Sequence, residues 1–122
     1  MKNQIGELKM AILDANYSNI DFEKTAASLG IQATYMPMLI KSFLSESEKL
    51  INNLKIAIEQ KNWDGISMNA HSLRGSAGNL QFNEIHDMAK DIELASMECD
   101  ETFEYNAYCV AIEKIVATIQ KV

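Results

Sequence analysis

The stretch Trp63–Leu80, WDGISMNAHSLRGSAGNL, decides the fold and also holds the most unusual residues of the chain. At about 100° of rotation per residue, its three Ile and Leu side chains and one alanine fall on one side of a helix. They are Ile66, Leu73, Ala77 and Leu80. His71 falls on the opposite side, so we expect it to face solvent. Asn62 is a suitable N-cap for this helix, and Asp64 in the first turn complements its dipole.

Apolar residues recur at helical spacing in three further long segments, at about 34–60, 84–98 and 102–120. The last of these segments has the clearest buried stripe. Its members are Tyr105, Tyr108, Ile112, Ile115 and Ile119. Four long amphipathic helices joined by short loops predict an all-α fold, an antiparallel four-helix bundle with one or two short extra helices at the N-terminus.

The ends of the N-terminal helices can also be predicted. Asp21 caps a short helix at about 22–28, which Gly30 ends. Thr34 is the expected N-cap of the first long helix, with Pro37 in its first turn. Residues 4–16 form a weaker amphipathic pattern that is compatible with another helix. We therefore expect one domain, with residues 1–19 as an N-terminal extension and 20–122 as the bundle.

Composition excludes several classes of partner. A net charge of −6 argues against nucleic acid and against an anionic membrane surface. No apolar run approaches the ~20 residues of a membrane span, and the first residues do not form a signal peptide. Cys99 and Cys109 are expected to be reduced and half-buried, which is typical of a cytoplasmic protein. We expect a monomer.

The surroundings of His71 suggest chemistry. Gly75 and Gly78 lie beside it at a combined cost of roughly 1–2 kcal/mol relative to alanine. Such small residues clear an approach for a second protein, and we predict the following docking residues: Gly75, Gly78, Ser67 and Met68. A neutral imidazole is a competent nucleophile. Arg74, one turn on, places positive charge near any anion attached to His71, and a phosphoryl group is the obvious candidate.

The segment His71–Gln81, HSLRGSAGNLQ, resembles the motif of the histidine-containing phosphotransfer domains of two-component phosphorelays. That motif reads approximately His-x-Leu-Lys-Gly-Ser-Ala-Gly-Asn-Leu-Gly, and the resemblance extends over about residues 20–120. The chain departs from it at Arg74, where lysine is commoner, and at Gln81, where the family has glycine. The resemblance implies that His71 carries the phosphoryl group, that Arg74 is the family's basic residue, and that Gly75 permits docking.

The same resemblance implies a phosphocarrier and not an enzyme with an ATP site of its own. The phosphoryl group would come from an aspartyl phosphate on a receiver domain and pass to the aspartate of a response regulator. A sensor histidine kinase, hybrid or not, would be the other partner. Mg²⁺ is expected on the receiver only, so the chain itself would need no cofactor and no metal.

Three other interpretations stay open. A helical docking or scaffold bundle with an incidental surface histidine would leave the two glycines unexplained. A metal site at His86 could use the acids near it, but there is no Glu-x-x-His pair on two helices. His86 is more simply a helix-surface or boundary residue. The dimerisation domain of a sensor kinase would show an acid and a proline-containing segment after its histidine, and this chain does not.

Overall fold

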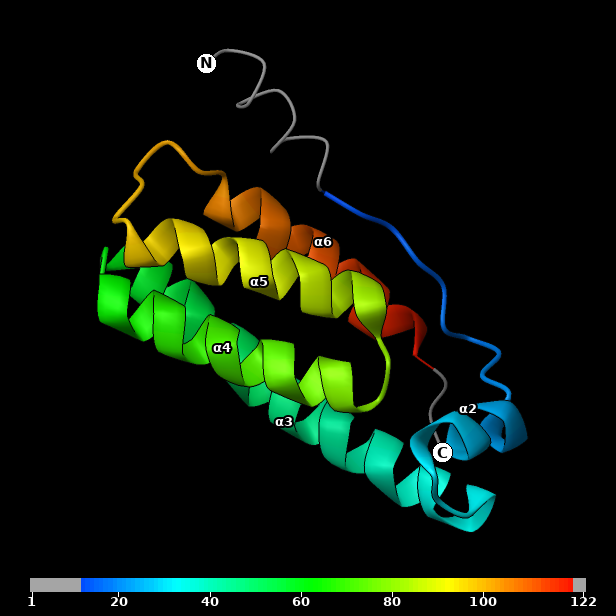
Figure 1. Cartoon of the computed structure of the whole chain (residues 1–122). Coiled ribbons are helices and arrows are strands. Elements are labelled where there is room, and N and C mark those ends of the chain that lie inside the picture. Colours follow the sequence, from blue (N-terminus) through cyan, green and yellow to red (C-terminus); the bar gives the residue numbers. More distant parts are fainter. Residues whose placement is uncertain (1–11, 120–122) are drawn as a thin grey trace.

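The structure is a computed structural model that describes residues 12–119, and it shows a bundle of helices (Figure 1). In chain order the elements are α2 (Phe22–Leu29), the 3₁₀ turn η1 (Ala33–Tyr35), α3 (Met36–Glu59), α4 (Trp63–Asn79), α5 (Asn83–Met97) and α6 (Tyr105–Thr118). Consecutive helices from α3 to α6 run antiparallel to each other, and α2 lies at the end where α3 begins. No strand occurs within residues 12–119. The predicted all-α bundle is confirmed.

The core lies where the apolar stripes of α3 to α6 meet. All four core residues predicted for the segment Trp63–Leu80 are buried, and so are all five of the α6 segment. Burial of each large aliphatic side chain contributes about 1.5–3 kcal/mol. On α3 the spacing of apolar residues predicts that Leu50 is buried, but the structure buries its neighbour Ile51 and leaves Leu50 half-buried. The packing of α4 between α3 and α5 fixes which way its polar residues point.

Two of the predicted helix starts are confirmed by their capping bonds. The carboxylate of Asp21 accepts a hydrogen bond from the backbone N–H of Lys24 at 3.0 Å, and Gly30 ends α2 in the left-handed conformation, with φ of 73°. The side-chain oxygen of Asn62 accepts from the N–H of Gly65 at 3.0 Å and begins α4. Side-chain caps of this kind satisfy backbone donors that have no partner within the helix.

Two other starts were predicted wrongly. Thr34 is not the N-cap of α3, because it lies inside η1, and α3 begins after Tyr35 without a side-chain cap. Residues already turned into a 3₁₀ helix cannot take the extended conformation that a cap needs. Helix α6 begins at Tyr105 and not near 102, because the carboxylate of Asp100 accepts from both the N–H and the hydroxyl of Thr102 and holds a loop there.

The N-terminal segment 12–21 contains no helix. The predicted helix at 4–16 is therefore wrong for residues 12–16, and its remaining part lies outside the described residues. Tyr17 attaches this segment to the bundle: its N–H donates to Thr118 Oγ1 at 2.9 Å, and its ring packs edge-on against Phe82. Its hydroxyl also donates to Glu84. These contacts with the bundle take the place of helical hydrogen bonds.

The cysteines and the helix lengths bear on two further expectations. Both cysteines are free, but neither is half-buried: Cys109 is buried on α6, and Cys99 is exposed just beyond α5. Among the described residues, no helix combines the length and the apolar character needed to cross a membrane.

We predict that the protein loses stability in alkaline solution. Burial raises the pKa of Tyr105 and Tyr108 to about 12, from 10.0, and that of the Cys109 thiol to about 11, from 9.0. The unfolded chain releases these protons at lower pH than the folded protein does. The free energy of unfolding should therefore have its full value below about pH 9 and decline from there to pH 12. Urea denaturation at a series of pH values measures this, and Cys109→Ala should flatten the first part of the decline. A constant free energy would contradict the prediction.

Candidate functional site

His71 lies in the middle of α4 and points away from the core. Its neighbours Ala70, Leu73 and Ala77 are completely buried, while 70% of the His71 side chain is exposed. The predicted orientation is therefore confirmed. Because α4 is held by its buried face, the imidazole stands at a fixed place on the surface, open to solvent.

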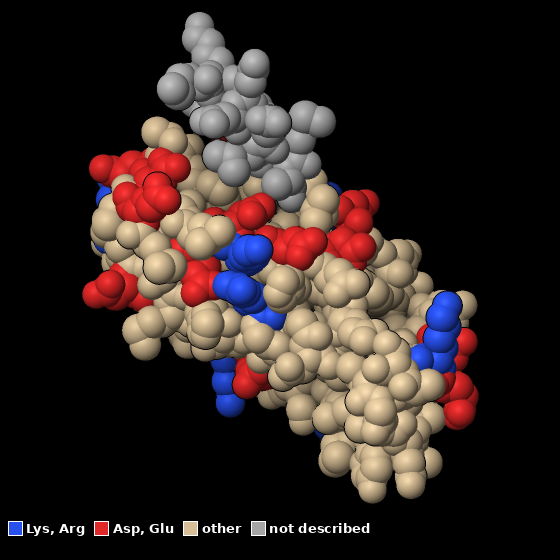
Figure 2. All heavy atoms as spheres, in the orientation of Figure 1, with Lys and Arg blue, Asp and Glu red and all other residues tan. Residues whose placement is uncertain are grey.

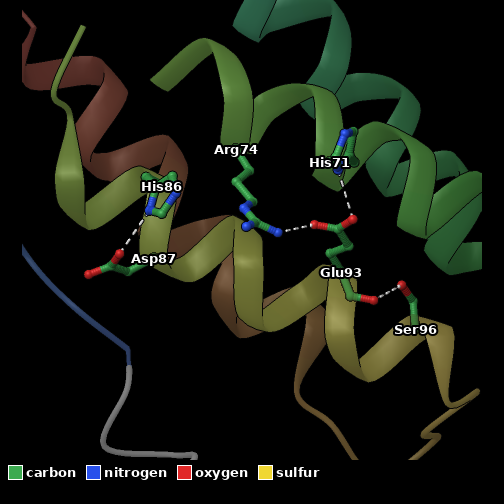
Figure 3. A network of polar contacts seen from close by, with 6 residues as sticks. All are labelled: His71, Arg74, His86, Asp87, Glu93 and Ser96. Atoms are coloured by element: carbon green, nitrogen blue, oxygen red, sulfur yellow. Dashed lines mark hydrogen bonds and ion pairs between the residues drawn. The ribbon is translucent and has the colours of Figure 1, made fainter. Parts of the chain in front are cut away.

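A carboxylate from the neighbouring helix bridges His71 and Arg74 (Figure 3). Glu93 of α5 lies with Oε2 2.8 Å from Nδ1 of His71, and its Oε1 accepts a hydrogen bond from Nη1 of Arg74 at 2.9 Å. The Glu93 side chain is only 12% exposed, so the contact is made at the seam between α4 and α5. The two predicted catalytic residues thus converge on one acid.

Glu93 is a site residue that sequence reasoning missed. It lies 22 positions beyond His71, and in the sequence it is one of several acids that follow His86, with nothing that relates it to His71. A signal was present, because Ala89, one turn earlier on α5, is a core residue. An acid at that position lies at the edge of the buried stripe and faces the adjacent helix.

The bridge determines which nitrogen of His71 is free. An ionised carboxylate can only accept hydrogen bonds, so the imidazole must donate to Glu93 through an Nδ1–H. In the neutral ring the other nitrogen, Nε2, then carries the lone pair. Since the ring is exposed, this lone pair is accessible to a second molecule. The arrangement suits nucleophilic attack by Nε2.

The two glycines of the motif have different surroundings. A Cβ added at Gly75 would meet nothing within 4 Å, whereas one at Gly78 would lie 3.2 Å from Cδ2 of His86. Gly78 therefore lets the His86 ring pack against α4. No described part of the chain requires a glycine at Gly75, where the absence of a side chain clears space only for something outside the molecule.

The remaining predicted docking residues flank His71. Met68 is 69% exposed, and Ser67 is half-buried, with its hydroxyl donating to the carbonyl of Asp64 at 3.1 Å. On the α3 side of α4 lies an open groove of about 430 Å³ between the end of α2, α3 and α4. Its lining includes Leu29, Ile31, Leu39, Phe43, Ser76 and Asn79. Figure 2 shows basic groups at the middle of the α4–α5 face, next to acidic ones.

Comparison with protein families supplies the decisive observation: residues 38–121 match the Hpt domain. The chain belongs to the Hpt domain family. Its function is therefore histidine phosphotransfer in a phosphorelay, and it is a phosphocarrier without a kinase ATP site. The match begins at residue 38, within α3, so it does not include α2. Comparisons with curated proteins and with solved structures gave no significant match.

The Hpt motif departs from its usual pattern at Gln81, and the structure shows how the helix ends there. Phe82 N–H bonds to the carbonyl of Ala77 at 2.9 Å, and Gln81 N–H bonds to that of Gly78 at 3.1 Å, which is the Schellman pattern. Gln81 takes a left-handed conformation, with φ of 62°, where glycine is usual. Its side-chain amide donates to Ser28 Oγ at 2.8 Å, which ties this turn to α2.

The second histidine of the Hpt domain lies apart from the His71–Glu93–Arg74 contacts. His86 is half-buried at the start of α5 and pairs with Asp87 at 2.9 Å (Figure 3). Its partial burial makes it a boundary residue, which is the simpler interpretation of His86 given in the sequence analysis. Within residues 12–119, no three His, Cys, Asp or Glu side chains are grouped so that they could hold a metal ion.

The two glycines can be tested by substitution with alanine. Gly75→Ala should raise the free energy of unfolding by about 0.5–1 kcal/mol, because alanine favours the helix and its Cβ meets open space. Gly78→Ala should raise it less or lower it, because the new Cβ presses on His86. Urea denaturation of both variants measures the difference. An equal gain at the two positions would contradict the assigned packing role of Gly78.

Proposed function

We propose that His71 is the phosphoacceptor of this Hpt domain and that Nε2 is the atom phosphorylated. The observation that carries the proposal is the contact between His71 Nδ1 and Glu93, made on an otherwise exposed ring. It places the proton on one nitrogen and the lone pair on the other. The interpretation of His71 as an incidental surface histidine does not account for the mostly buried Glu93 carboxylate that contacts both His71 and Arg74.

The transfer is an in-line displacement at phosphorus. The Nε2 lone pair of His71 forms a bond to phosphorus as the bond from phosphorus to the receiver's aspartate oxygen breaks. The aspartate leaves as a carboxylate with the electron pair of that bond. The ring keeps its Nδ1 proton and becomes positively charged, and Glu93 stabilises this charge from 2.8 Å. Passage to the next aspartate is the reverse of the same step.

Receiver domains are the phosphorelay partners of an Hpt domain. We propose that a receiver docks over Gly75 and Met68, with Ser67 and Gly78 on the α5 side, and reaches into the groove beside Ser76. Gly75 supports this, because nothing within the described chain fills the space above it. A monomer would present this face, and the receiver would supply the Mg²⁺. The two free cysteines fit a cytoplasmic location.

The phosphoacceptor is tested by His71→Gln. A phosphorylated receiver, or the small phosphoryl donor phosphoramidate, should label the wild-type protein, and the label should be lost in acid, as phosphohistidine is. His71→Gln should accept none, because an amide nitrogen has no basic lone pair. Intact-mass measurement and acid lability check the result, and His86→Gln is the matched control, which should label normally. Full labelling of His71→Gln would refute the assignment.

The docking face is tested by Gly75→Gln. The longer side chain stands in the path of the partner, so transfer from a receiver should fall at least about tenfold, while labelling by phosphoramidate should persist. The helix should not suffer, because glutamine is a better helix former than glycine. Comparing the two donors on one variant separates docking from chemistry. An unchanged rate with the receiver would contradict the docking role of Gly75.

A further inference from the structure

Arg74 does not have a free charge in the unphosphorylated domain. Its guanidinium already binds Glu93, and the formal charges of the two groups cancel. A phosphoryl group arriving on His71 therefore meets a cation that is held by a carboxylate. Either the phosphoryl group takes Arg74 from Glu93, or the two anions share it.

We propose that Arg74 changes partner from Glu93 to the phosphoryl group each time His71 is phosphorylated, and that Glu93 takes it back when the group leaves. Glu93 is then a positioning residue with a second effect: it competes with the phosphoryl group for Arg74 and so limits how firmly that group is held. This inference rests on His71 being the phosphoacceptor.

The positions of the three residues allow this exchange. His71 and Arg74 are one turn apart on α4, whereas Glu93 approaches from α5. The Arg74 side chain is 34% exposed and Glu93 12%, so the guanidinium can move outward while the carboxylate stays in the seam. When Arg74 leaves, Glu93 keeps the hydrogen bond from His71 Nδ1 through its other oxygen. The other oxygen, Oε1, loses the guanidinium, and in a side chain that is 12% exposed this loss opposes the exchange and limits how far it goes.

Charge gives the exchange its direction. A doubly charged phosphoryl group attracts a guanidinium more strongly than a singly charged carboxylate does, and a guanidinium can bind its oxygens through two parallel hydrogen bonds. The competition reduces this gain, because the pair with Glu93 must first be broken. Pairs that are partly exposed to solvent contribute modestly. The retained group is thus bound loosely enough to be passed on.

The experiment uses the whole chain, loaded with phosphoramidate so that no partner is needed. The half-life of the label at neutral pH is measured by intact mass for the wild type, Glu93→Gln, Arg74→Gln and the double variant. Gln keeps an oxygen that accepts from Nδ1–H but carries no charge to hold Arg74. Asp87→Asn is the matched control, because it neutralises a carboxylate that pairs with the other histidine.

We expect Glu93→Gln to lengthen the half-life about two- to fivefold, the size of one partly exposed ion pair. In the Arg74→Gln background the same change should not lengthen the half-life, since no cation remains to be competed for and only the stabilisation of the ring charge by Glu93 is lost. Asp87→Asn should match the wild type. In NMR spectra the Arg74 Nε–H signal should shift on phosphorylation of the wild type and less in Glu93→Gln.

Two results would overturn the exchange while leaving the phosphoacceptor intact. One is an unchanged half-life in Glu93→Gln. The other is an equal change in half-life, in either direction, with and without Arg74, which would mean that Glu93 does not act by competing for Arg74. If the wild type takes no label at His71, the proposed function fails, and this inference fails with it.

Discussion

The burial of one face of α4 is the constraint on which the site depends. Leu73 and Ala77 are completely enclosed between α3 and α5, and a helix turns through about 100° per residue. Because these side chains are buried, His71, on the opposite side of the helix, must face solvent. Rotating the helix to hide the imidazole would expose apolar surface worth several kcal/mol. The position of the nucleophile is thus set by side chains that never touch it.

The same burial determines where α5 can supply a partner. With α4 and α5 packed side by side, a residue at the margin of the α5 stripe faces the margin of α4. Glu93 occupies that place and reaches both His71 and Arg74. Packing therefore brings together a nucleophile, a cation and an acid from two helices, although none of the three belongs to the core.

The sequence predicts the features that are determined within a single helix, such as burial, exposure and capping. The burial of Leu73, the exposure of His71 and the cap at Asn62 follow from periodicity and local chemistry, and the structure confirms them. The contact with Glu93 depends on how two helices are placed against each other, which a single sequence does not reveal. Gly75 and Gly78 looked alike for the same reason, since only the neighbouring α5 shows that Gly78 has His86 beside it.

The contact between Tyr17 and Thr118 brings two distant parts of the sequence together at 2.9 Å. Residues near both limits of the described chain thus lie side by side. A circularly permuted protein follows from this: a short linker from residue 119 to residue 17, with new termini in the loop between α5 and α6, would keep all four bundle helices and the buried Ile119. The order of the helices along the chain is thus separable from their order in space. The contacts of His71 with Glu93, and of Glu93 with Arg74, depend only on how the helices are arranged in space.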